Sequence, residues 1–470
     1  MQRSKLFIVV VLLTSVWSTY AATASEHFDG AQDAKSRGVM ERAEQNIERY
    51  RKGDFEIKLI DEKSGRPISQ EVKIELKNHC FDFGVNLFQV ESLSGRMRKA
   101  AHETVKDIFN MVVVCDYFSK WWYWLTNSEN KEYIFYPAQQ DMKFAEANDT
   151  RMRFHAVWYN LPTWMDSSAW SEDQIWAMLE DRIKYVAQNY GDRVDEYDVI
   201  NEIIFIQAKF YKPNPNYPNF ADPQQTKRAF ELARRYLPTQ KLVALESGIA
   251  TVKDGNWFAQ ALQQHRNMIA AGVDFDYVGY QGHFYYKRLD YRDGHVDLGA
   301  DCFTMGAISD GLDLLGELGK PVVITEFNGP SRSTSSRKGG KDDKDDSNDD
   351  NDPLWTLSDD ENADWQINFY RLAFSKPYIR QITRWFMVDE LAGRGIDAGM
   401  LDKMGNKHAI YDKLRHLIKE EWHTLYRGES SGGEVSFRGF YGRYSVNVDG
   451  YKPSEVELNS AGEYKVVMRR

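Results

Sequence analysis

Eight short apolar runs, each followed by a helical stretch, constrain the fold of this chain more than any other feature. Short apolar runs bounded by polar residues are typical of buried strands, and their alternation with amphipathic stretches indicates parallel βα units. Eight such units close most naturally into a (β/α)8 TIM barrel, an α/β fold whose active sites lie at the carboxyl ends of the strands. The predicted strands cover residues 81–87, 111–115, 151–158, 194–201, 241–246, 275–281, 321–326 and 381–388.

Alternating apolar and polar residues at both ends of the chain predict further strands outside the barrel. Residues 55–60 and 71–76 predict a β-hairpin with one apolar face, preceded by an exposed helix over residues 32–51. Segments beyond Gly433 alternate in the same way. Because a lone hairpin is marginally stable in water, the two ends are expected to form one small accessory β-module. Few of its aromatic side chains are expected at the surface, which favours a structural cap over a glycan-binding role.

The N-terminus has the pattern of a signal peptide. A basic flank from Arg3 to Lys5 precedes an apolar run over residues 6–13 and small residues around Ala22. This run is far shorter than the roughly 20 residues of a transmembrane helix, so we expect export to the periplasm or beyond the cell, with no membrane span. The expected organisation is a signal peptide (1–24), a helix and hairpin (25–80), the barrel (81–425) and C-terminal β-segments (426–470).

Charge and composition limit the kinds of partner that the chain can bind. The formal net charge is -10, and no basic patch could exchange counterions for phosphates, so nucleic acid is excluded as a partner. Residues 331–352, rich in Asp, Lys and Ser, predict a disordered excursion of the loop after the seventh strand. Their spacing is not that of a calcium loop, and the three cysteines lack metal-ligand spacing. No metal or other cofactor is predicted.

Glutamates lie at the ends of the fourth and the seventh predicted strands. The fourth leads into Asn201 and Glu202, and the seventh ends at Glu326, so both glutamates are expected at the mouth of the barrel. Two carboxyl groups about 5 to 5.5 Å apart suit retaining glycoside hydrolysis, in which one is the nucleophile and the other protonates the leaving oxygen. A single glutamate at a strand end could instead cap the next helix. That alternative explains a pair less well, so the pair predicts catalysis at a glycosidic bond.

Four short motifs resemble those of glycoside hydrolase family 10, the family of retaining endo-β-1,4-xylanases. They read Arg-Phe-His at 153–155, Asp-Val-Ile-Asn-Glu at 198–202, Gly-Tyr-Gln-Gly-His-Phe at 279–284 and Ile-Thr-Glu-Phe at 324–327. The resemblance extends from about residue 81 to residue 418. It implies that Glu202 is the acid/base and Glu326 the nucleophile. The implied substrate is a polysaccharide or oligosaccharide, xylan or xylo-oligosaccharides, cleaved by double displacement.

The resemblance also implies a set of substrate-binding residues. Asn201 would hold the 2-hydroxyl of the reacting sugar, and Trp385 would form the platform beneath it. Gln281 and His283 are two apart on one strand, so their side chains point to the same face, where His283 could orient Glu326. The full implied set is Asn201, His155, Gln281, His283, Trp385, Trp158, Lys120 and Trp121.

Several positions depart from the family pattern. Tyr117 replaces an asparagine that would read hydroxyls of the neighbouring sugar, so that subsite is expected to be altered or blocked. Tyr159 stands where a second histidine is expected, in a motif that is one residue shorter than usual. Asn328 replaces an aspartate that would support His283.

These departures leave two alternatives to a xylanase. One is a β-glycosidase of the same fold that acts on a different β-glycan or glycoside. The other is a non-catalytic glycan-binding protein, against which the intact Glu202, Asn201, His283 and Glu326 argue. The sequence leaves the oligomeric state open, and also whether cleavage is internal or terminal.

Overall fold

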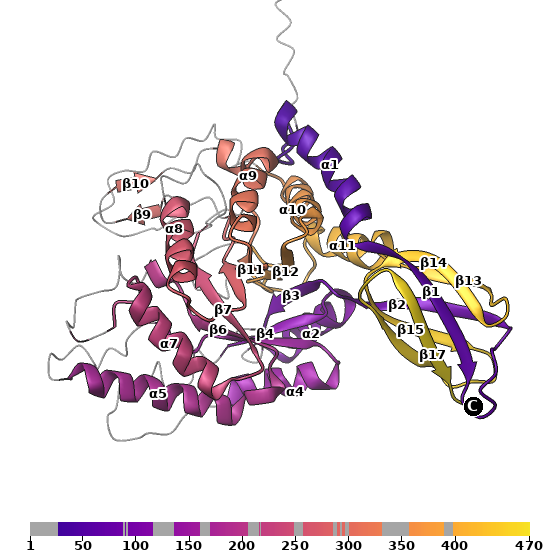
Figure 1. Ribbon diagram of the computed structural model, residues 1–470. Helices are drawn as coiled ribbons and strands as arrows, with labels where there is room; N and C mark the ends of the chain where they lie inside the picture. Colours follow the sequence, from indigo (N-terminus) through magenta and orange to yellow (C-terminus); the bar gives the residue numbers. More distant parts are fainter. Residues whose placement is uncertain are drawn as a thin grey trace, which may run out of the picture.

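The structure comprises an α/β barrel and a β-module that lie side by side (Figure 1). A computed structural model describes residues 27–87, 90, 93–115, 136–159, 170–204, 216, 218–248, 257–284, 289–291, 294–296, 300–330, 357–389 and 398–470 of the 470-residue chain. The predicted signal peptide and the Asp-rich segment over residues 331–352 lie outside these residues.

Eight parallel strands form the closed barrel, in the order β11-β12-β3-β4-β5-β6-β7-β8. Almost all of their residues are buried, as expected for strands that are filled on one side and covered by helices on the other. This arrangement confirms the predicted (β/α)8 fold. The strands are β3 (Asp82–Asn86), β4 (Met111–Cys115), β5 (Arg151–His155), β6 (Glu196–Ile200), β7 (Lys241–Glu246), β8 (Tyr277–Tyr280), β11 (Val322–Phe327) and β12 (Ile379–Arg384).

Helices surround the barrel, and their first turns are set by capping side chains. Ser171 and Gln174 form a reciprocal capping box at the start of α5, and Ser358 and Glu361 form another at the start of α10. None of the described helices is long and apolar enough to cross a bilayer. The helices and short strands around the barrel sheet are α2 (Gly95–Ile108), α4 (Tyr136–Ala147), α5 (Glu172–Asn189), η3 (Gly191–Arg193), α7 (Pro223–Tyr236), α8 (Trp257–Ala270), β9 (Leu289–Tyr291), β10 (Gly294–Val296), η4 (Ala300–Phe303), α9 (Met305–Gly316), α10 (Asp359–Ser375), α11 (Ala409–His416) and η6 (Leu417–Glu421).

The two ends of the chain together build the β-module, as their alternating patterns predict. One sheet has the order β14-β1-β17 and the other β13-β2-β15-β16. The predicted hairpin is wrong, because β1 and β2 lie in different sheets. Each has C-terminal strands on both of its edges, which leaves neither edge for the other. The strands are β1 (Lys52–Asp61), β2 (Glu71–His79), β13 (Leu425–Glu429), β14 (Glu434–Phe440), β15 (Gly442–Val448), β16 (Ser454–Leu458) and β17 (Gly462–Met468).

The module and the barrel share a continuous apolar core. Helix α1 (Ala34–Tyr50) precedes the module and packs against α9 and α10 (Figure 1). Its buried face carries Val39, Ala43 and Ile47, so the helix lies where it was predicted but is covered on its apolar side. Because β2 ends shortly before β3 begins, the module adjoins the N-terminal end of β3. The carboxyl ends of the barrel strands, where catalysis is predicted, face the other way.

Candidate active site

The backbone turns sharply at Glu202, directly after β6. Its φ angle is 55°, in the left-handed region that residues other than glycine rarely adopt. Hydrogen bonds to both neighbouring strand ends hold this turn. Asn201 N donates to Trp158 O at 3.0 Å, and Glu202 N donates to Leu245 O at 3.1 Å. The direction of the Glu202 side chain is therefore imposed by the surrounding strands.

Gln281 links the two predicted catalytic carboxyl groups. Its Nε2 donates to Glu202 Oε1 at 2.8 Å and lies 3.3 Å from Glu326 Oε1. Because one nitrogen reaches both oxygens, these oxygens are at most about 6 Å apart, a limit compatible with the spacing of about 5 to 5.5 Å in retaining glycosidases. The same nitrogen lies 3.4 Å from Asn201 Oδ1. Four residues that sequence analysis selected are thus brought together at one end of the barrel.

Glu326 has two histidines around its carboxyl group. His283 Nε2 lies 2.9 Å from Oε2, and His155 Nε2 lies 3.7 Å from Oε1. Arg153, in the barrel interior below, donates from Nη2 to Thr325 O at 2.7 Å, one residue before Glu326. Only 3% of Glu326 is exposed. The nucleophile predicted from the sequence therefore lies in a buried setting, in which His155 and Arg153 oppose the rise in pKa that burial causes.

The orientation of His155 is set by a buried carboxylate. Asp198 Oδ2 lies 2.7 Å from His155 Nδ1 and 3.7 Å from Arg153 Nε, and all three side chains are fully buried. Since a carboxylate only accepts, Nδ1 carries the proton of this bond. The ring is thereby held with Nε2 toward Glu326. His155 thus contacts the nucleophile, although sequence analysis assigned it only to hydroxyl binding.

The tautomer of His283 is set by Asn328. The amide Nδ2 of Asn328 lies 2.7 Å from His283 Nδ1 and can only donate, so Nδ1 accepts and the ring proton is on Nε2. That proton points to Glu326 Oε2. An aspartate at this position would instead accept from Nδ1 and favour a doubly protonated ring.

Tyr159 contacts the second oxygen of the predicted acid/base. Its hydroxyl donates to Glu202 Oε2 at 2.8 Å, whereas Gln281 donates to Oε1. Sequence analysis noted Tyr159 as a departure from the family pattern but assigned it no role. The contact depends on the path of the chain after β5, which no local pattern reveals.

Glu246, the last residue of β7, was not among the site residues predicted from the sequence. It is fully buried, and it accepts hydrogen bonds from Ile204 N at 2.8 Å and from Ser247 N at 3.3 Å. It thereby secures the turn that follows Glu202. Burial raises the pKa of Glu246 to about 8, and the nearby Glu202 charge acts in the same direction. The signal was available, since a third carboxylate ends a predicted strand.

The predicted aromatic residues divide between the site and the core. Trp385 is partly exposed, and its ring centre lies 5.1 Å from that of His155 and 6.2 Å from that of His283, nearly perpendicular to both. Trp158 is fully buried, and its Nε1 donates to Leu179 O of α5 at 3.3 Å. Its assignment to the cleft wall is therefore wrong, because the indole turns outward between strand and helix. The predicted binding residues Lys120 and Trp121, and Tyr117, lie outside the described residues.

Both carboxyl groups have a raised pKa. Burial raises the pKa of Glu326 to about 7, opposed by His155 and Arg153. Burial also raises the pKa of Glu202, opposed by the hydrogen bond from Gln281. The charge of Glu326 raises the pKa of Glu202 further. Glu326 faces histidine and arginine nitrogens that oppose the effect of burial, whereas Glu202 receives hydrogen bonds from the neutral Gln281 and Tyr159.

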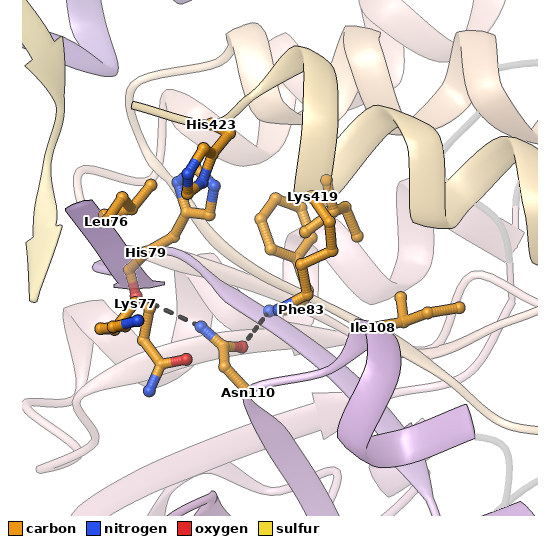
Figure 2. Close-up of a pocket in the computed structure, with 10 residues that line it drawn as sticks. Leu76, Lys77, His79, Phe83, Ile108, Asn110, Lys419 and His423 are labelled. Atoms are coloured by element: carbon orange, nitrogen blue, oxygen red, sulfur yellow. Dashed lines mark hydrogen bonds between the residues drawn. The ribbon is translucent and has the colours of Figure 1, made fainter. Parts of the chain in front are cut away.

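A separate cavity of about 100 Å³ lies at the opposite end of the barrel. Figure 2 shows Asn110 at its base, where Oδ1 accepts from Phe83 N at 2.8 Å and Nδ2 donates to His79 O at 3.2 Å. Lys77 and Lys419 are among its lining residues, which include no carboxylate. It lies beside the starts of β3 and β4, so it is not the site of the paired glutamates. In the part of the chain that the structure describes, no cluster of His, Cys, Asp or Glu could hold a metal ion.

Curated relatives include an anti-sigma factor and xylanases. Anti-sigma-I factor RsgI6 of Acetivibrio thermocellus is 24% identical over 416 residues, which cover 87% of this chain and 46% of that protein. Endo-1,4-beta-xylanase B of Thermotoga neapolitana is 27% identical over 202 residues, which cover 43% of this chain and 53% of the relative. The chain thus spans about half the length of these two curated relatives.

Solved structures share the barrel fold. Xylanase 10B from Thermotoga petrophila RKU-1 in complex with xylobiose has a TM-score of 0.55 at 20% identity, covering 73% of this chain and 94% of that one. Native xylanase 10B from Thermotoga maritima has a TM-score of 0.54 at 20% identity, with coverages of 73% and 95%. The sequence pattern described as Glycosyl hydrolase family 10 matches residues 74–413. Because this match spans most of the sequence, the chain belongs to glycosyl hydrolase family 10.

Proposed function

We propose that this protein is a retaining glycoside hydrolase that cleaves β-1,4-xylosidic bonds in xylan or xylo-oligosaccharides. One observation carries the proposal, namely the bridging of Glu202 and Glu326 by the single amide nitrogen of Gln281. The resulting limit of about 6 Å between the bridged oxygens supports a direct nucleophile over the wider spacing that an inverting enzyme needs for water.

In the first step, Glu326 attacks the anomeric carbon while Glu202 donates its proton to the leaving glycosidic oxygen. A covalent glycosyl-enzyme forms, and the bond to the leaving sugar breaks. In the second step, Glu202 as a carboxylate takes a proton from water, which attacks the anomeric carbon and releases Glu326. The nitrogens of His283 and His155 around Glu326 support its role as the ionised partner.

The other residues of the site bind and orient the reacting sugar in this proposal. Asn201, next to the acid/base, is placed to bond the 2-hydroxyl, a contact that strengthens as positive charge develops on the ring. Trp385 supplies the platform, consistent with its position beside both histidines. His283 holds Glu326 in the direction of attack.

Family membership and the names of the xylanase relatives support xylan as the substrate. Another β-glycan is the alternative, because the Tyr117 substitution alters the sequence of the neighbouring subsite. A non-catalytic role is the second candidate, favoured by one observation: the relative that aligns with 87% of this chain is named an anti-sigma factor. We also propose that the protein is exported, on the signal-peptide pattern of residues 1–24.

Incubation with a panel of β-glycans, followed by measurement of new reducing ends, separates these functions. Among the glycans of the panel, only xylan should yield new reducing ends. Proton NMR should show the first product in the β-anomeric form. Hydrolysis of a different glycan, with no hydrolysis of xylan, would show that this glycan is the substrate. Glycan binding without any new reducing ends would favour the non-catalytic role, and an α-anomer as first product would exclude the double displacement.

A further inference from the structure

The segment after β5 runs beside β6 as far as the acid/base. Val157 N donates to Asp198 O at 2.8 Å, and Trp158 N donates to Val199 O at 3.0 Å. Trp158 then forms a parallel bridge with Ile200. Since neighbouring side chains of an extended segment alternate, Trp158 turns outward to α5 and Tyr159 turns inward to Glu202.

Both oxygens of Glu202 are consequently held by neutral donors from other parts of the barrel. Gln281 holds Oε1 at 2.8 Å, and Tyr159 holds Oε2 at 2.8 Å. A hydroxyl that donates to a carboxylate stabilises the ionised form and fixes its direction. The carboxyl of Glu202 cannot rotate without breaking one of these bonds.

We propose that Tyr159 is a positioning residue for Glu202, and that its hydroxyl sets the alkaline limit of activity by stabilising the ionised acid/base. The inference rests on the proposed function, in which Glu202 must be protonated to cleave the substrate. Activity is then lost as the pH rises through the pKa of Glu202. Without the tyrosine hydroxyl, Glu202 keeps its proton to a higher pH.

The titratable groups near Glu202 come from three other strands. Glu326 on β11 raises the pKa of Glu202, and His283 after β8 would lower it only with a doubly protonated ring. Glu246 on β7 is the third, and the charge of Glu202 raises the pKa of Glu246. Burial is the largest cause of the raised pKa, and the hydrogen bonds from Gln281 and Tyr159 oppose it. Removal of one opposing bond therefore moves the pKa further upward.

The test measures kcat/KM on xylotriose against pH for the wild type and Tyr159→Phe. The alkaline limb should move upward by about one to two pH units, as expected for one lost hydrogen bond to a charged group. Tyr236→Phe is the matched control, because Tyr236 donates to Glu180 Oε1 at 2.5 Å between α7 and α5, outside the site. It should leave the limb unchanged.

Two further measurements distinguish an effect of Tyr159 on Glu202 from an effect on folding or on turnover. Tyr159→His restores a donor, which is neutral at alkaline pH, so its limb should return toward the wild-type position. Titration of the Glu202 carboxyl by carbon-13 NMR, assigned with Glu202→Gln, should show the same upward shift in Tyr159→Phe without any substrate.

An unchanged Glu202 titration in Tyr159→Phe, or an equal shift in Tyr236→Phe, would overturn the inference. A wild type that titrates as described but hydrolyses no β-glycan would instead contradict only the proposed function.

Discussion

Asn328 Nδ2 donates to His283 Nδ1 at 2.7 Å, which places the ring proton of His283 on the nitrogen that faces Glu326. The Asn328 amide donates a hydrogen bond to Nδ1, whereas a carboxylate would accept one from it. The ring therefore carries a single proton and is neutral while it donates to Glu326. A neutral ring stabilises the ionised nucleophile less than an imidazolium would. Asparagine in place of aspartate at position 328 therefore changes the pH at which Glu326 ionises and leaves the orientation of Glu326 intact.

Asn328→Asp should move the acid limb of kcat/KM to lower pH. The introduced carboxylate accepts from Nδ1, so His283 holds both protons and its positive charge lowers the pKa of Glu326. Glu326 must be ionised to attack, and activity falls as the pH drops through its pKa. Burial now raises that pKa to about 7, and a limb that stays there or moves upward in the variant would contradict this account.

Glu326→Ala and Glu202→Ala should separate the two catalytic roles. Loss of Glu326 removes the nucleophile, so turnover should vanish for xylan and for aryl xylosides alike. Loss of Glu202 should slow xylan cleavage by about 10² to 10⁴, the usual contribution of an acid/base. Formation of the glycosyl-enzyme from an aryl xyloside with a good leaving group should survive, because that step needs no proton, and stopped-flow release of the aryl group measures it. Near-wild-type xylan cleavage by either variant would refute the assignment.

Glu246→Ala should destabilise the fold, whereas Glu246→Gln should not. Alanine leaves the buried Ile204 N–H without its acceptor, at a cost of about 1 to 3 kcal/mol in the free energy of unfolding. Glutamine keeps an oxygen for this bond. Urea unfolding at pH 6 measures both variants, and equal stabilities would show that the bond to Ile204 contributes nothing.

The same glutamine variant tests the raised pKa of Glu246. Because the pKa is about 8 in the folded protein and about 4.3 in the unfolded chain, the wild type should lose stability relative to Glu246→Gln as the pH rises between these values. Below about pH 4 the difference should be constant. A difference that does not vary with pH over this window would show that Glu246 ionises normally.

Arg51→Met should weaken the attachment of the β-module to the barrel. Arg51 donates from Nε to Phe374 O at 2.6 Å, and from Nη2 to Lys376 O at 2.6 Å and Ile379 O at 2.8 Å. Methionine leaves these carbonyls without their donors, which should cost about 2 to 4 kcal/mol. Arg49→Met, on the exposed side of α1, is the control. Thermal unfolding measures both, and equal melting temperatures would contradict the role of Arg51.

The barrel was predictable because its signals are local. Each strand is a short apolar run, and the motif residues Glu202, Gln281 and Glu326 occupy the ends of such runs. The order of a (β/α)8 barrel follows the order of the chain, so these ends converge without further information.

The pairing of strands that lie far apart in the sequence was not predictable. The N-terminal strand β1 pairs with β14 and β17, which lie more than 370 residues further along the chain, so the alternating pattern predicted strands but assigned the wrong neighbour. The direction of Trp158 and the contact between Tyr159 and Glu202 depend likewise on the path of the chain after β5. Glu246 was overlooked because a lone strand-end carboxylate has no partner visible in the sequence.

Trapping of the covalent intermediate tests the central claim most directly. A 2-deoxy-2-fluoro xyloside with a good leaving group slows both steps, and it slows the second enough for the glycosyl-enzyme of a retaining enzyme to accumulate. Mass spectrometry of the intact protein should show one added fluoroxylosyl group, and peptide sequencing should place it on Glu326. The absence of an adduct while the enzyme hydrolyses xylan, or an adduct on another residue, would contradict the account.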